Sequence, residues 1–315
     1  MTEPSLLGTI AVTDYGWYAA LLNQPVLEEV NFWKPSATRP TRAPEFSPFI
    51  FKLRAPYNAI CGFGYFAQYS RLPDWLAWDT FGMANGCSSL AEMQSRITGI
   101  RDRIRFRGGN VAEIGCVLIA QPTLFPMDRW VLPPRDWSPR TQVDKRYDLT
   151  AGEGARVWLE CLTAASVLPR KDLTSRASVD QSPKYGTPQL VAPRLGQGIF
   201  RVAVMDAYSR ACAVTAEHSL PALEAAHFRP FAHEGPHEVR NGILLRADLH
   251  RLLDRGYVTI SRDWRFQVSN RLKQDFDNGR SYYPFHGQSV EPPTQPDDRP
   301  ATTYIEWHNE HVYLG

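Results

Sequence analysis

The chain has 315 residues, of which 43% are hydrophobic and 22% are charged, and its formal net charge at pH 7 is +2. This composition excludes an intrinsically disordered protein and leaves room for two domains of ordinary size, each with its own core. No apolar run is long enough to span a bilayer, and the N-terminus lacks a leader pattern, so we expect a cytoplasmic protein without membrane segments. The five cysteines are widely spread and form no CxxC pair, which argues against a disulfide framework and a structural zinc site.

Residues 8–149 are predicted to be mostly β-structure with one or two short helices. In the run PFIFKLRAP, strict alternation places Phe49 and Phe51 on one face of a strand. The next apolar run contains Gly62 and Gly64 between aromatic residues. Glycines inside a strand usually mark a bulge or the close approach of another backbone or of a ligand, and we expect one of these here.

Helical patterns interrupt this β-rich half. Trp75 and Trp78 are three residues apart and would share one side of a helical turn. The two serines at 88–89 are candidate N-caps for the helix-forming residues behind them. The continuous apolar run at 114–122 predicts an interior strand, and residues 152–166 predict a further helix.

Four arginines occupy every second position from Arg101 to Arg107. They would share one face of an extended segment and would spread around a helix. They are either a solvated charged face or a stripe that contacts phosphates.

A stretch rich in proline, serine and charge, residues 169–194, has five basic residues against two acidic ones. Such composition is typical of a linker between domains. We therefore expect an N-terminal domain at 1–165, a linker at 166–195 and a C-terminal domain at 196–315.

The C-terminal half carries His227 at the end of an apolar strand, Asn241 after a turn-rich loop, and His250 beyond a second apolar run. The segment LLRADLHRLLDRG around His250 has helical periodicity. Strand, loop, strand and helix with His, Asn and His at these points resemble the HNH nuclease motif, the ββα-metal finger. The stretch at 194–215 also resembles the part of the chain that precedes the finger in one HNH subgroup.

The resemblance implies a role for each of the three residues. His227 would be the general base that activates water, Asn241 would hold the finger loop in shape, and His250 would bind one divalent cation at the scissile phosphate. A histidine suits the first task because its ordinary pKa lies near neutrality. The implied enzyme is a metal-dependent DNA endonuclease.

One position departs from the family pattern. Many HNH nucleases carry an acidic metal ligand directly before the first histidine, where this chain has Ala226. Asp248 and Asp254 are the nearest replacements, and Asp254 would share a helix face with His250 four residues earlier. Glu224 is expected on the other face of the strand. A cation with few protein ligands suits Mg²⁺ or Mn²⁺.

Other expectations concern residues around this motif. Arg229 and Arg246 are candidates for phosphate contacts, although Arg229 could equally form a salt bridge. His233 and His237 lie in the loop and are expected to be exposed rather than catalytic. Residues 303–314 predict a terminal strand.

The run at 194–215 predicts a strand in which Phe200, Val202 and Val204 alternate inward, followed by a turn at Cys212. We expect Cys212 to be structural, since no second cysteine is near enough to share a zinc ion.

In the N-terminal half, the order of VNFWKPS, FIFKL and AICGFGYFAQYSRLP is similar to a PUA-like β-barrel of the EVE or SRA kind. This resemblance implies a domain that flips a modified base into an aromatic pocket and recognises it by stacking and by hydrogen bonds to its edge. The aromatic candidates for this pocket are Trp17, Tyr18, Trp33, Tyr65, Trp75 and Trp78.

The expected fold class is thus α+β, with a PUA-like β-barrel domain followed by a ββα-metal HNH domain. The combination resembles type IV restriction endonucleases, which cut DNA carrying 5-methyl- or 5-hydroxymethylcytosine. The expected partner is double-stranded DNA, and because one finger cuts one strand, we expect a homodimer on DNA.

Two other functions stay open from the sequence. The first is an HNH nuclease whose N-terminal domain senses phosphorothioate DNA or another phage-defence signal. The second is a non-catalytic DNA-binding protein with a decayed finger, which Ala226 motivates.

Overall fold

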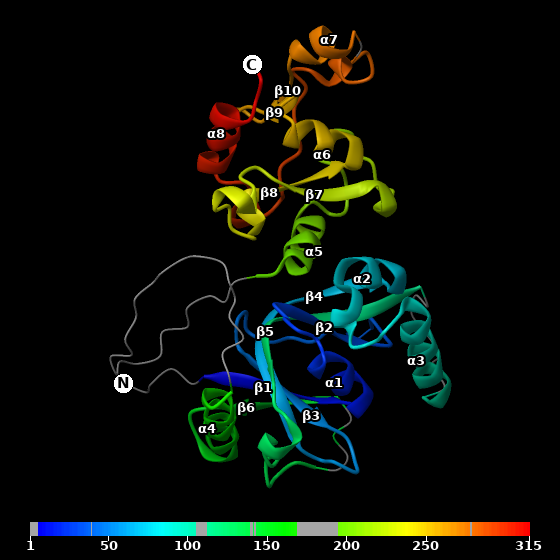
Figure 1. Cartoon of the computed structure of the whole chain (residues 1–315), viewed down its shortest axis with the longest axis vertical. Coiled ribbons are helices and arrows are strands. Elements are labelled where there is room, and N and C mark those ends of the chain that lie inside the picture. Colours follow the sequence, from blue (N-terminus) through cyan, green and yellow to red (C-terminus); the bar gives the residue numbers. More distant parts are fainter. Residues whose placement is uncertain are drawn as a thin grey trace. The chain divides into compact units, whose positions relative to one another are not determined.

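The computed structural model of the chain (Figure 1) describes residues 6–38, 40–104, 112–138, 141, 143–168, 195–277 and 279–315. The chain divides into two compact units, residues 1–195 and 196–315. Most of the expected linker, and Arg105 and Arg107 of the arginine series, lie outside the described residues. Within the described ranges, none of the helices has the length and apolar character needed to cross a membrane.

The first unit is built on one six-stranded sheet. Its order is β2-β5-β4-β3-β1-β6; β1 and β3 are parallel, and the other neighbours are antiparallel. The strands are β1 (Leu7–Thr13), β2 (Glu29–Lys34), β3 (Pro48–Leu53), β4 (Ile60–Pro73), β5 (Glu113–Leu124) and β6 (Asp144–Asp148). The apolar run predicted as an interior strand is β5, between β2 and β4.

The sheet is open over the described residues, so the closed barrel expected from the sequence is not observed. Its two edge strands are β2 and β6. Lys34 of β2 and Asp144 of β6 form an ion pair of 3.2 Å. What the structure establishes is therefore a mixed α+β unit with a multi-stranded sheet.

Four helices belong to this unit: α1 (Tyr15–Leu22), α2 (Asp74–Phe81), α3 (Leu90–Arg103) and α4 (Gly152–Ser166). The Ser89 hydroxyl caps α3 by accepting a hydrogen bond from the Glu92 N–H at 3.1 Å, as the sequence predicted for a serine here. Helices were also predicted for the segments of α2 and α4, and both are confirmed.

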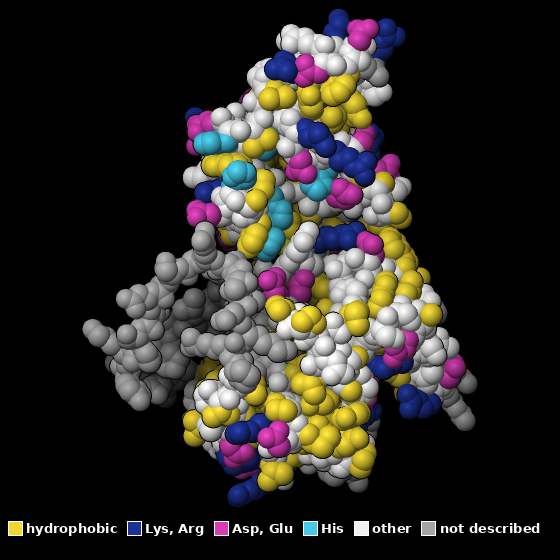
Figure 2. All heavy atoms as spheres, in the orientation of Figure 1, with side chains coloured by type: hydrophobic (Ala, Val, Ile, Leu, Met, Phe, Trp, Pro, Cys, Tyr) yellow, Lys and Arg dark blue, Asp and Glu magenta, His cyan; other side chains and the backbone are white. Residues whose placement is uncertain are grey.

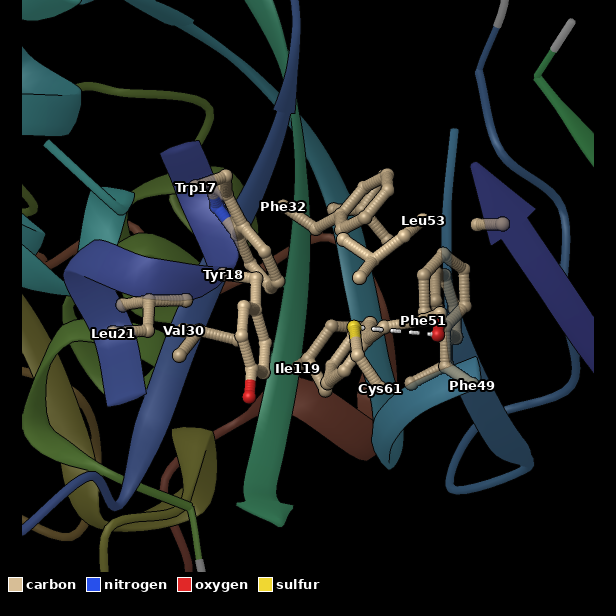
Figure 3. Close-up of a cluster of buried hydrophobic side chains, with 13 residues drawn as sticks. Trp17, Tyr18, Leu21, Val30, Phe32, Phe49, Phe51, Leu53, Cys61 and Ile119 are labelled. Atoms are coloured by element: carbon tan, nitrogen blue, oxygen red, sulfur yellow. Dashed lines mark hydrogen bonds between the residues drawn. The ribbon is translucent and has the colours of Figure 1, made fainter. Parts of the chain in front are cut away.

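The sheet has a hydrophobic core on each face, because its strands alternate two sets of apolar side chains. Phe49 and Phe51 face one cluster with Trp17 and Tyr18 of α1 (Figure 3). Ile50 faces the second cluster, to which α4 contributes. The two helices therefore cover opposite faces of the sheet (Figure 1).

The glycines inside β4 lie where a neighbouring strand comes close. A Cβ atom at Gly62 would lie 2.4 Å from the Thr123 carbonyl oxygen, and one at Gly64 would lie 2.4 Å from Ile119 Cγ2. The register of β4 with β5 also shifts between Phe63 and Tyr65. The predicted bulge and close approach are confirmed.

The second unit contains a ββα finger and several elements around it. The finger is β7 (Leu223–His227), β8 (Gly242–Arg246) and α6 (Ala247–Asp254), with β7 and β8 antiparallel. The other elements are α5 (Gln197–Ala207), β9 (Val258–Ile260), β10 (Phe266–Val268), α7 (Arg271–Phe276) and α8 (Thr302–His311).

Two strand predictions in this unit are wrong. The strand expected around Phe200, Val202 and Val204 is helix α5, and its apolar residues are buried on nearly every side, so period-two alternation was not a sound guide. The expected terminal strand is helix α8, which buries Ile305 and His308, three residues apart.

All five cysteines lie in described regions, are buried, and form no disulfide bond. Four of them, Cys61, Cys87, Cys116 and Cys161, belong to the first unit, and Cys212 belongs to the second. Burial raises the pKa of the Cys161 thiol to about 12 and that of Cys87 to about 11.

Candidate active site

His227 is the last residue of β7 and is paired with Gly242 of β8. Its ring stacks on Phe200 of α5, with 3.9 Å between ring centroids and 12° between planes. Burial, helped by the charges that His237 and His250 can carry, lowers the pKa of His227 from 6.5 to about 4. The ring is therefore neutral at neutral pH, which is the state that a general base needs.

Asn241 is fully buried and bonds to two positions in the loop between β7 and β8. Its side-chain oxygen accepts a hydrogen bond from the Arg229 N–H at 2.9 Å, and its amide donates to the Arg229 and Pro236 carbonyls at 2.8 and 3.0 Å. These are the contacts that the loop-holding role expected of Asn241 would require.

Asn241→Ala should lower the free energy of unfolding of the second unit by about 2–4 kcal/mol, because one N–H and two carbonyls at Arg229 and Pro236 lose their buried partner. The measurement is urea unfolding, with hydrogen exchange over residues 228–241 as the local readout. The control is Asn270→Ala, an exposed position without a side-chain cap bond. Equal effects of the two changes would contradict the prediction.

His250 lies on α6 between two carboxylates. Its Nδ1 is 2.7 Å from Oε2 of Glu224, and its Nε2 is 3.4 Å from Oδ2 of Asp254. Glu224, which the sequence made the less favoured candidate because it lies on the other face of the strand from His227, thus contacts His250. In a strand, residue 224 shares a face with Ala226 rather than with His227, and this is the face that meets α6.

The donor atoms around His250 suit a hard cation bound at one edge of the ring. The Nε2–Asp254 separation of 3.4 Å is close to the ~3 Å expected between adjacent ligands of an octahedral ion with bonds of about 2.1 Å. Glu224, at hydrogen-bond distance from Nδ1, can instead fix the ring's tautomer and orientation. Within the described residues no three His, Cys, Asp or Glu side chains converge as a metal site, so water and phosphate oxygens would have to complete the shell.

Asp248 and Arg246, expected at the metal and at phosphate, are paired with each other. The guanidinium Nε and a terminal nitrogen donate to the two carboxylate oxygens at 3.0 and 2.7 Å. Hydrogen bonding to Arg246 lowers the pKa of the Asp248 carboxyl. Asp248 and Arg246 are thus each other's structural partner, and these contacts do not direct either side chain toward His250.

Arg229 is engaged within its own loop. Its Nε donates to the His233 carbonyl at 2.6 Å, and its guanidinium lies 5.6 Å from the ring centre of Trp307. It also approaches Glu234 at 3.7 Å. These contacts favour the salt-bridge alternative over a phosphate contact.

The loop histidines differ from one another. His233 is exposed, as expected, but His237 is half-buried and its Nδ1 lies 3.1 Å from Nε2 of His227. This contact could not be expected from the sequence, because His237 has no fixed place in the motif. Several histidine side chains gather on one face of the second unit (Figure 2).

The aromatic residues expected to line a base pocket fall into two groups. Trp17 and Tyr18 are core residues rather than pocket residues, because they form the buried side of α1 (Figure 3). The Tyr18 hydroxyl donates to the Phe125 carbonyl at 2.7 Å, and the Trp17 indole N–H points to the Asn31 carbonyl at 3.4 Å. The remaining four keep partial exposure: Trp33, Tyr65, Trp75 and Trp78.

A buried polar cluster adjoins Trp33. Asn31 donates to Asn85 Oδ1 at 2.9 Å, and the Trp33 indole donates to the Asn85 carbonyl at 2.9 Å. Among the described residues of the first unit, three buried side-chain oxygens have no hydrogen-bond partner: Asn31 Oδ1, Ser70 Oγ and Thr80 Oγ1. Unpaired buried oxygens are usually satisfied by internal water or by a ligand. The sequence did not single out these residues.

A model of the HNH endonuclease family matches residues 212–261, which include β7, β8 and α6. The second unit therefore contains an HNH endonuclease domain, and the sequence-based prediction of a DNA endonuclease is confirmed. HNH nucleases use a divalent metal ion. No curated protein matches the chain.

Two solved structures illustrate what else the chain is similar to. The ASCH protein from Zymomonas mobilis is 12% identical, with 48% of this chain and 93% of that chain covered and a TM-score of 0.33. A modification-dependent restriction endonuclease, TagI, is 13% identical, with 96% and 81% covered and a TM-score of 0.28. Similarity at this level does not establish a shared fold.

Proposed function

We propose that this chain is a modification-dependent restriction endonuclease, in which residues 196–315 cut DNA and residues 1–165 recognise a modified base. One observation carries the catalytic part. The finger of an HNH domain holds a neutral histidine, His227, together with a second histidine flanked by two carboxylates, Glu224 and Asp254.

In the proposed reaction, His227 accepts a proton from the attacking water as the water oxygen bonds to phosphorus, and the bond to the leaving deoxyribose oxygen breaks. His250 and Asp254 would hold Mg²⁺ or Mn²⁺, with Glu224 orienting the His250 ring. When bound, the cation would neutralise charge on the phosphate and on the leaving oxygen. Asn241 would keep the loop after His227 in place.

The proposed reader is a PUA-like domain formed by the first unit. Trp33, Tyr65, Trp75 and Trp78 are partly exposed and could stack on a flipped base. The unpaired oxygen of Asn31, which like Trp33 bonds to Asn85, could accept a hydrogen bond from a polar ligand. A base such as 5-methyl- or 5-hydroxymethylcytosine offers both a π-face and a polar edge. Double-stranded DNA is the proposed substrate, cut by a homodimer.

The test is cleavage of matched duplexes that are unmodified or carry 5-methylcytosine, 5-hydroxymethylcytosine or phosphorothioate, with Mg²⁺ or Mn²⁺. We expect cutting only of a duplex with a modified base. Cutting of phosphorothioate DNA alone would keep the nuclease and replace the reader. Equal cutting of all four would remove the modified-base proposal, and no cutting would favour a DNA-binding protein.

Sedimentation that finds only monomers with and without DNA would contradict the dimer.

A further inference from the structure

We propose that His237 is a positioning residue, which holds His227 in the one neutral tautomer that leaves a ring nitrogen available to the attacking water. The proposal deepens the nuclease function and rests on His227 acting as the base. Neither residue spacing nor the family match assigns this role to His237.

The geometry leaves two arrangements of protons. Nε2 of His227 and Nδ1 of His237 are 3.1 Å apart, a hydrogen-bond distance, so one proton lies between them. If His227 donates, its own Nδ1 carries a lone pair. If His237 donates, the proton of His227 sits on Nδ1, and its single lone pair is already occupied by His237.

The first arrangement is the one that catalysis can use. Nδ1 of His227 has no hydrogen-bond partner among the residues that the structure describes, so it is the nitrogen that can accept a proton from water. The His237 ring must then accept at Nδ1 and carry its own proton on Nε2. The water O–H bond breaks, the new N–H bond forms at Nδ1, and His227 as a cation still donates from Nε2 to His237. This hydrogen bond is charge-assisted and strengthens as the proton arrives.

The surroundings hold both rings in this orientation. Phe200 stacks on His227, while Phe231 stacks on His237 with centroids 5.0 Å apart and planes within 2°. Asn241 binds the carbonyl of Pro236, the residue before His237. The same buried asparagine thus fixes the backbone that carries the positioning histidine.

Two substitutions separate positioning from packing. His237→Asn retains an acceptor near the place of Nδ1 but loses the ring that stacks on Phe231. His237→Phe retains a stacking ring but has no acceptor. General-base catalysis contributes about 10²–10⁴-fold, so losing the orientation of the base should cost about 10- to 100-fold in rate.

We expect His237→Phe to reduce the single-turnover cleavage rate by about 10- to 100-fold, with DNA and Mn²⁺ affinities unchanged, and His237→Asn to recover most of that loss. The opposite ranking, with Phe active and Asn impaired, would show a packing role and overturn the proposal. Loss of DNA or Mn²⁺ affinity in both variants would also overturn it.

A second readout does not depend on cleavage. In ¹⁵N-histidine-labelled full-length protein, the ring nitrogens of His227, assigned by comparison with His227→Ala, should show a proton on Nε2 in the wild type and a mixture of tautomers in His237→Phe. A proton on Nδ1 of His227 in the wild type would contradict the proposal. A wild type that cuts no duplex, yet shows the expected tautomer, would instead refute the proposed nuclease mechanism and leave the His227–His237 arrangement standing.

Discussion

Replacing His227 with alanine should reduce single-turnover DNA cleavage by at least about 100-fold while DNA binding persists. His227 supplies the neutral ring nitrogen that would take the proton from water, and its low pKa keeps that nitrogen unprotonated at neutral pH. The remaining contributions, charge neutralisation and substrate positioning, do not create a nucleophile by themselves. The measurement is cleavage, with enzyme in excess, of a duplex that the wild-type protein cuts. DNA binding is followed by fluorescence anisotropy.

The matched control is His233→Ala, which removes a histidine from the same loop at an exposed position. It should cleave at close to the wild-type rate. Circular dichroism should show that His227→Ala keeps its fold despite losing the ring stacked on Phe200. If His227→Ala cut as fast as His233→Ala, the assignment of the base would be wrong.

The second large effect is expected on metal binding. Asp254→Asn should weaken Mn²⁺ binding by about 100-fold and Glu224→Gln by about 10-fold, since the first would remove a ligand and the second would loosen the orientation of His250. Isothermal titration calorimetry measures both, and the Mn²⁺ concentration needed for half-maximal cleavage should rise in parallel. Removal of the metal by a chelator should stop cleavage in every variant.

Asp248→Asn is the control for these two variants. Its carboxylate is paired with Arg246, so its neutralisation should change Mn²⁺ affinity less than either of the other substitutions. If Asp248→Asn gave the largest loss, the ligand set would be His250 with Asp248, one of the two aspartates first considered from the sequence.

The sequence predicted local structure well where one face of an element is distinct from the other. Phe49 and Phe51 alternate with Ile50, and the two sides of that strand enter different cores. Prediction failed at α5, where the apolar residues leave no polar side from which to infer a period. The sequence also could not show whether the sheet closes into a barrel, because the pairing of distant edge strands is not encoded in either strand alone.

The same limit applies to the candidate site. His227, Asn241 and His250 could be located because the motif fixes their order along the chain. Glu224 and His237 could not, since one reaches His250 across a strand–helix contact and the other reaches His227 through a loop fold. Chain order carries no direct information on either contact.

The distribution of cysteines gives this protein its own probes of partial opening. Every thiol is buried, so an alkylating reagent can modify one only after the surrounding structure opens. Because Cys212 is the single cysteine after residue 195, mass spectrometry of the alkylated peptides would time the opening of the finger-containing unit separately from that of the sheet. Binding of DNA or metal to either unit could then be measured as slower labelling of that unit's own thiols, without adding a dye or tag.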